Sequence, residues 1–112
     1  MACPLFLPSA PLSGECAAEP AAAIPPDILQ RCCNTGYARG VCARAGQSDA
    51  DAFRFLIKAA ERGTVEVAWS IERNHHPLAV GTSVITETTA RSDKPLERQA
   101  RAYASSLMLL RP

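Results

Sequence analysis

The chain carries five cysteines in 112 residues, and these are its residues best suited to chemistry. Three of them fall within the stretch ILQRCCNTGYARGVCARAG, and the other two lie upstream in proline-rich sequence. They are Cys3, Cys16, Cys32, Cys33 and Cys42. Clustered thiols bind metal ions or iron–sulfur clusters, form disulfides or act as nucleophiles. The spacing of the cysteines indicates which of these roles is favoured.

The spacing is C-x12-C-x15-C-C-x8-C, which matches none of the common short-range cysteine motifs. Zinc ribbons supply their ligands as closely spaced cysteine pairs, and thioredoxin-like enzymes use C-x-x-C ahead of a helix. Disulfides are disfavoured because the count is odd and the first residues lack the basic region of a secretory signal. We therefore expect a cytoplasmic protein, in a reducing compartment where clustered cysteines more often bind metal.

An iron–sulfur cluster, of the [4Fe–4S] type, suits widely spaced cysteines better than a single zinc ion does. A cubane is larger than one ion, so four thiolates can reach it from separate loops. Proline beside a ligand cysteine, as in Cys3-Pro4, recurs in such sites. Zinc held by the same thiolates is the alternative cofactor, although its usual paired spacing is missing.

Positive charge accompanies the downstream cysteines. Arg31, Arg39 and Arg44 lie among them, and residues 32–47 contain no acidic side chain. A cluster or a zinc ion with four thiolates is anionic, so we expect these arginines and nearby backbone N–H groups to hold its charge. Tyr37 is expected to shield the centre from solvent. The charge pattern favours an anionic metal centre without separating iron–sulfur from zinc.

The expected ligands are Cys3, Cys16, Cys33 and Cys42. Cys32 is the alternative to Cys33, because neighbours in a helix point about 100° apart and both are not expected to face one site. Cys33 is preferred because it lies nearer the turn, where backbone amides become available. The spare cysteine is expected to be a small buried apolar residue.

The segments CCNTGYARGVC and ERNHHPLAVG, with the upstream CP, resemble small cysteine-rich bacterial proteins of the iron–sulfur type. The resemblance covers most of the chain. It implies a bound cluster and transfers no reaction, since the activity of those proteins is unassigned.

Other candidate residues have simpler explanations. His75 and His76 lie in an expected turn and are interpreted mainly as exposed residues, although one of them could reach the site as a ligand or as a proton-coupled neighbour. A cysteine nucleophile is disfavoured, because Cys32 and Cys33 would meet the negative end of a helix dipole. No P-loop, G-x-S-x-G or H-E-x-x-H motif occurs. An enzyme is therefore the weakest interpretation.

The overall composition is that of one globular domain. Hydrophobic residues make up 47% and charged residues 21% of the chain, and the net charge is +1. Such a balance argues against a nucleic-acid or anionic-membrane partner, which usually requires a strongly basic protein. No apolar run approaches the roughly 20 residues that span a bilayer.

The elements that must position the cysteines divide near residue 47. Residues 1–47 are expected to form a loop-rich cysteine cap with a short helix at PPDILQRCC. Residues 48–112 are expected to form a scaffold, in which apolar residues at helical spacing predict a helix from Ser48 to Gly63.

The rest of the scaffold is expected to be a β-hairpin followed by a helix. TVEVAWSIER and LAVGTSVITE alternate like strands, with a two-residue turn at Asn74 and His75 that pairs Trp69 with Val80. A last helix is predicted from about Lys94 to Leu110.

The expected fold class is α+β: a cysteine cap packed on a β-hairpin that two helices cover. The expected function is cluster binding for electron transfer or for redox or oxygen sensing, with a protein redox partner and without turnover of a substrate. The alternative is an interaction module that zinc staples together.

Overall fold

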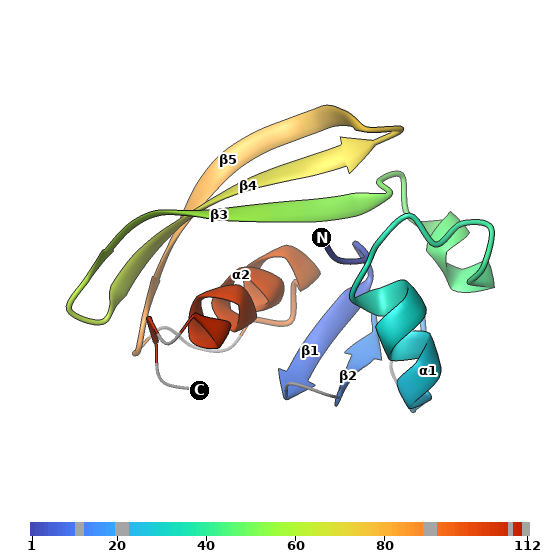
Figure 1. Ribbon diagram of the computed structural model, residues 1–112, viewed down its shortest axis with the longest axis horizontal. Coiled ribbons are helices and arrows are strands. Elements are labelled where there is room, and N and C mark those ends of the chain that lie inside the picture. The colour runs from blue at the N-terminus through green and yellow to red at the C-terminus, as the bar shows by residue number, and fades with distance from the viewer. Residues whose placement is uncertain (11–12, 20–22, 89–91, 108, 111–112) are drawn as a thin grey trace.

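The computed structural model describes residues 1–10, 13–19, 23–88, 92–107 and 109–110 (Figure 1). Two short strands, β1 (Phe6–Ala10) and β2 (Ser13–Cys16), form one antiparallel sheet. A short helix, α1 (Pro26–Ile28), continues into a π-helical turn at Leu29–Cys33, and a 3₁₀ turn occupies Ala43–Gln47. Three long strands follow, β3 (Ala52–Glu61), β4 (Thr64–Arg73) and β5 (His76–Thr86), and then helix α2 (Pro95–Ser106).

The expected α+β fold with two helices over a hairpin is therefore wrong. The described residues form a β-rich protein with five strands in two sheets and only two α-helices, one of them a single turn. The helix predicted from Ser48 to Gly63 is strand β3, which pairs along its length with β4. One helix, α2, covers one face of a three-stranded sheet (Figure 1).

The three-stranded sheet has the order β3-β4-β5 and is antiparallel throughout. The predicted two-residue turn is confirmed, because Arg73 pairs with His76 and both Asn74 and His75 have positive φ. Farther along the hairpin, however, the predicted pairing of β4 with β5 is wrong by one residue. An irregularity between Ile71 and Glu72 shifts the register there. Trp69 therefore faces Gly81, whose missing side chain leaves room for the indole ring.

Helix α2 packs on the inner face of this sheet and closes the main hydrophobic core. Alternate β4 residues, Val65 and Val67, are buried there against Ala100 and Ala104. The helix ends at Ser106, short of the predicted end near Leu110. The outer face of the sheet has no covering layer among the described residues, and Leu56, Leu78, Val80 and Val84 are exposed on it.

The cysteine segments form two smaller hydrophobic clusters beside the main core. One cluster joins Cys3 and Cys33 to Phe6 and Leu29. The other joins Cys32 to Ala38 and Ala45, with Cys42 packed against them. None of the helices in the described ranges is long and apolar enough to cross a membrane.

A candidate metal–thiolate centre

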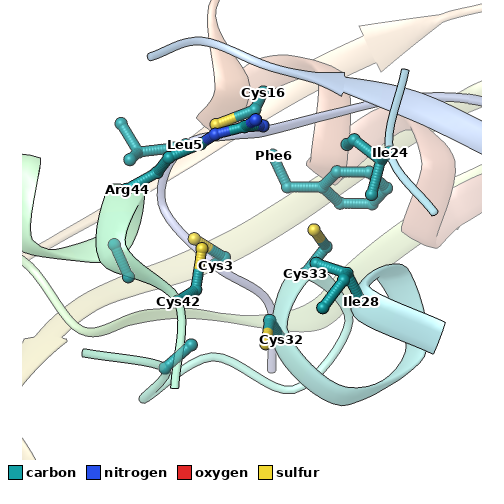
Figure 2. A pocket seen from close by; sticks show the side chains of 12 residues that line it. Cys3, Leu5, Phe6, Cys16, Ile24, Ile28, Cys32, Cys33, Cys42 and Arg44 are labelled. Carbon is teal, nitrogen blue, oxygen red and sulfur yellow. The ribbon is translucent and has the colours of Figure 1, made fainter. Parts of the chain in front are cut away.

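All five cysteines line one pocket (Figure 2). The pocket lies between the β1–β2 hairpin, the helical turn and the 3₁₀ turn, with Cys16 on one side and Cys32 and Cys33 on the other. The other lining residues are Leu5, Phe6, Ile24, Ile28, Ala38, Arg44 and Ala45. Its void is about 30 Å³, more than the roughly 10–15 Å³ that one water molecule needs and still small. Five thiols thus surround a small and mostly apolar space.

Cys3 is held in the turn ahead of β1. Its backbone N–H donates to the carbonyl of Cys33 at 2.9 Å, and its own carbonyl accepts the N–H of Phe6 at 3.0 Å. The backbone N–H of Leu5 donates to the Cys3 sulfur. Two cysteine segments that are thirty residues apart are therefore bonded to each other directly.

The β1–β2 hairpin brings Cys16 to the same place. Cys16 pairs with Phe6 across the hairpin, and the N–H of Ala17 donates to the carbonyl of Leu5 at 2.8 Å. Gly14 permits this close pairing, because a Cβ there would come within 2.5 Å of the Phe6 ring. Cys16, at the end of β2, and Cys3, in the turn ahead of β1, thus reach the same pocket.

Cys32 and Cys33 both line the pocket, contrary to the expectation that only one would face it. Residues 29–33 form a π-helical turn, closed by the Asn34 N–H bonding to the Leu29 carbonyl at 3.0 Å. A π turn holds more residues than an α turn, so neighbouring side chains diverge less, and such turns occur frequently at functional sites. Gly36, with a φ of 71°, then turns the chain away.

Cys42 enters from the short segment between two small alanines. Its N–H donates to the Ala38 carbonyl at 2.7 Å, and its carbonyl accepts the Ala45 N–H at 3.1 Å. Both alanines are buried, which allows the segment to lie close against the helical turn. Cys42 is the one cysteine that is not fully buried.

Burial disfavours ionisation of two of the thiols, those of Cys3 and Cys33. It raises the pKa of Cys33 to about 12, and repulsion from the other four thiols adds to the rise. Burial also raises the pKa of Cys3, although the N–H of Leu5 partly offsets it. Thiols with raised pKa values are poor nucleophiles at neutral pH. Cys3 and Cys33 are therefore poorly suited to nucleophilic catalysis in the metal-free protein.

One of the three expected arginines faces the thiols. Arg44 lines the pocket and forms an ion pair with Glu19 at 2.6 Å. Arg31 instead pairs with Asp27 at 3.6 Å on the surface. Arg39 turns toward the main sheet, so the sequence overestimated the positive charge at the site.

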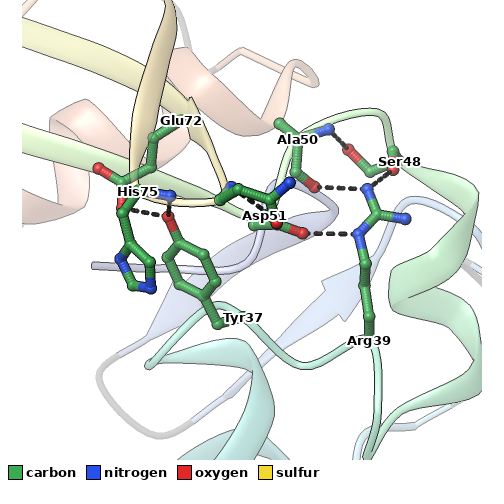
Figure 3. Close-up of polar contacts among 8 residues, drawn as sticks. Tyr37, Arg39, Ser48, Ala50, Asp51, Glu72 and His75 are labelled. Atoms are coloured by element: carbon green, nitrogen blue, oxygen red, sulfur yellow. Dashed lines mark hydrogen bonds and ion pairs between the residues drawn. The ribbon is translucent and has the colours of Figure 1, made fainter.

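A polar junction that the sequence did not reveal anchors the cap to the sheet (Figure 3). The hydroxyl of Tyr37 donates to Glu72 Oε1 at 2.6 Å and accepts the backbone N–H of His75 at 2.9 Å. Arg39 Nε donates to Asp51 Oδ1 at 2.6 Å. Both carboxylates are buried, so these bonds hold the loop that carries Tyr37 and Arg39.

The junction concentrates unusual backbone conformations. Tyr37, Asn74 and His75 all have positive φ, between 51° and 64°. The rings of Tyr37 and His75 stack at 4.5 Å, so the histidine reaches the cap without lining the thiol pocket. Hydrogen bonds from the Asn74 N–H and from Arg39 lower the pKa of Asp51. Positive φ strains residues other than glycine, so Tyr37, Asn74 and His75 keep it only because the surrounding structure holds them.

The five thiols are donors of the kind that thiolate-bound zinc and iron–sulfur centres use. Among the residues that the structure describes, no three His, Cys, Asp or Glu side chains lie close enough together to hold one metal ion. A single zinc ion would therefore require the thiols to converge. A cluster would require the 30 Å³ void to widen.

Comparison with known proteins adds no identification. No family model matches the chain, and no curated protein or solved structure matches it either. The resemblance to cysteine-rich bacterial proteins stays an expectation drawn from the residues.

Proposed function

We propose that the five-cysteine pocket binds an iron–sulfur cluster, of the [4Fe–4S] type, with Cys3, Cys16, Cys33 and Cys42 as ligands. The observation that carries the proposal is that all five cysteines, from separate segments of the chain, line one apolar pocket. When bound, the cluster supplies one-electron chemistry. The chain would act in electron transfer or in redox or oxygen sensing, in a reducing cytoplasm and with a protein redox partner.

The surroundings of the thiols support a metal role over a merely structural one. Five thiols that bound nothing would need no common pocket, since a free cysteine packs like any small apolar residue. Arg44 lies at the pocket wall, where its guanidinium, which is paired with Glu19, would also face an anionic centre. The apolar walls formed by Phe6 and Ile28 would exclude water from it.

To widen the pocket for a cluster, the segment that carries Cys42 would have to move outward. This is the least buried of the five cysteines, and it is followed by a short 3₁₀ turn. Its neighbour Val41 is largely exposed, so few packing contacts oppose an outward movement there. Cys3, Cys16 and Cys33 are held by bonds between strands and turns, and they would keep their places.

Zinc is the second candidate, and the small size of the void favours it. A single ion needs less room than a cluster, and four thiolates are a common structural zinc set. Zinc would then stabilise the cap without any redox role.

The deciding experiment is elemental analysis of protein that is produced and purified without oxygen. Iron and acid-labile sulfide with a brown colour are expected. A colourless protein with one zinc per chain would support the second candidate, and protein that takes up neither metal would refute both.

Single cysteine variants test the ligands. Cys42→Ala is expected to abolish metal binding, whereas Cys32→Ala, a matched removal of a thiol from the same pocket, is expected to retain it. If Cys32→Ala lost metal binding and Cys33→Ala retained it, Cys32 would be the ligand in place of Cys33.

A further inference from the structure

Gln99 is the only buried polar side chain of α2 within the described part of the chain, and it reaches the cysteine segment. It is 4% exposed. Its Nε2 group donates to the carbonyls of Cys3 and Phe6, both at 2.8 Å. One amide group therefore spans both ends of the turn that carries the Cys3 thiol.

These two bonds join parts of the chain that are far apart in sequence. Gln99 lies 96 residues from Cys3 and 93 residues from Phe6. The Cys3 N–H is already bonded to the carbonyl of Cys33. The peptide groups beside the first thiol are consequently held by a second cysteine segment on one side and by α2 on the other.

The amide carries a cost as well as its two hydrogen bonds. The Gln99 carbonyl oxygen is buried and has no hydrogen-bond partner among the described residues. Burial of this unpaired oxygen costs free energy, which offsets part of what the two hydrogen bonds to the Cys3 and Phe6 carbonyls contribute. What the amide adds is a fixed orientation of the Cys3 turn.

We propose that Gln99 is a positioning residue of the metal centre, one that orients Cys3 through the backbone and makes metal retention depend on α2. This inference rests on the proposed function. Groups that orient metal ligands without touching the metal commonly change metal affinity by about 10- to 100-fold when they are removed.

The test compares metal release from two variants of the same helix. Gln99→Met keeps the length of the side chain and removes both donors. Tyr103→Ala, the matched control, removes a ring that packs against Phe55 in the main core and has no bond to the Cys3 turn. Each protein is loaded without oxygen, and transfer of its iron (or zinc) to a chelator is timed.

Gln99→Met is expected to release metal at least about ten times faster than wild type. Tyr103→Ala is expected to release metal at nearly the wild-type rate, even though its melting temperature falls. Release at the wild-type rate from Gln99→Met overturns the inference. So does equal acceleration in both variants, because a general loss of stability then accounts for the effect.

Failure of this inference is separable from failure of the proposed function. Wild-type protein that takes up no metal overturns both, whereas normal loading with unchanged release from Gln99→Met overturns only this one. A second variant, Gln99→Glu, serves if Gln99→Met fails to fold. It keeps the shape of the Gln99 side chain but has at most one proton to donate, so it cannot bond to both the Cys3 and Phe6 carbonyls. It too is expected to release metal faster than wild type, and wild-type release from it counts against the inference.

Discussion

The thiols of Cys3 and Cys33 hold their protons more tightly than free cysteine does, because burial disfavours the thiolate. A metal must therefore displace protons from the pocket. The apparent metal affinity should rise with pH, since each thiolate formed in advance removes part of that cost. Because these thiols ionise more readily in the unfolded chain, the metal-free protein is expected to lose stability at alkaline pH.

The alkaline sensitivity gives a residue-scale prediction. The pKa of Cys33 is about 12 in the folded protein, against an ordinary value of 9.0. A group whose pKa is raised by folding contributes stability that is complete below the ordinary value and is lost as the pH rises toward the folded value. We expect the free energy of unfolding of metal-free protein to fall between about pH 9 and pH 12.

Denaturant unfolding over this range, with a chelator present, measures the effect. Cys33→Ala removes the group and is expected to flatten the decline. A decline of equal slope in Cys33→Ala would show that other groups cause it.

At the scale of elements, strand β3 marks the limit of what the sequence could predict. Ala52, Phe53, Leu56 and Ile57 match the spacing of a helix stripe, but Phe53, Phe55 and Ile57 also alternate as a strand does. Pairing with β4 decided between the two patterns, and no local rule reports a partner. Helical spacing and alternation overlap in a short apolar segment.

The apparent helix start at Ser48 failed for a related reason. The Ser48 hydroxyl accepts the N–H of Ala50 in a local turn instead of capping a helix. The Asp51 carboxylate binds Arg39 and the backbone of Asn74, which lie 12 and 23 residues away. A cap signal and a tertiary ion pair use the same residue types, so only the fold distinguishes them.

Elements with purely local determinants were easier to predict. The turn at Asn74 and His75 and the last helix are encoded by neighbouring residues. The expectation of a shared cysteine site followed from their number and from the missing short-range motifs. The arrangement of their supports did not, because Gln99 and Glu72 act over long separations in sequence.

Two leucines provide a matched prediction at the element scale. Leu29, in the π-helical turn, is 2% exposed and packs with Cys3, Cys33 and Phe6, whereas Leu56 on β3 is 66% exposed. Leu29→Ala should destabilise the metal-free protein by about 2–5 kcal/mol. Leu56→Ala should cost less than about 1 kcal/mol.

Chemical denaturation of both variants without metal gives the two values. Because the substitution is the same, the difference isolates burial from the change of residue type. Equal losses would mean that the π-helical turn is not packed in the metal-free protein.

At the scale of the whole molecule, the thiol pocket and the main core are separate hydrophobic units. The main core between α2 and the three-stranded sheet contains no cysteine. The two smaller clusters contain Cys3, Cys32, Cys33 and Cys42, and Cys16 lines the same pocket. Polar bonds from Gln99 and from the junction of Tyr37 and Arg39 connect these units. They fix the position of one unit relative to the other, while the two hydrophobic cores stay separate.

This division predicts a local response to metal removal. Ligand binding to the folded state stabilises most strongly the parts whose opening releases the ligand. Amide hydrogens in the cysteine segments, such as the Asn34 N–H bonded to Leu29 and the Cys42 N–H bonded to Ala38, should exchange faster in metal-free protein. Amides of Val65 and other residues of β4 should keep their protection.

Hydrogen exchange followed by mass spectrometry, on loaded and chelator-treated protein, makes the comparison. Gln99→Met provides the matched test of the connection, since loss of its two bonds should free the Cys3 turn and leave β4 unchanged. A uniform rise in exchange across both units would mean that they unfold together. The polar bonds between them would then join the two units into one cooperative structure, and metal would stabilise the entire chain instead of the cysteine cap alone.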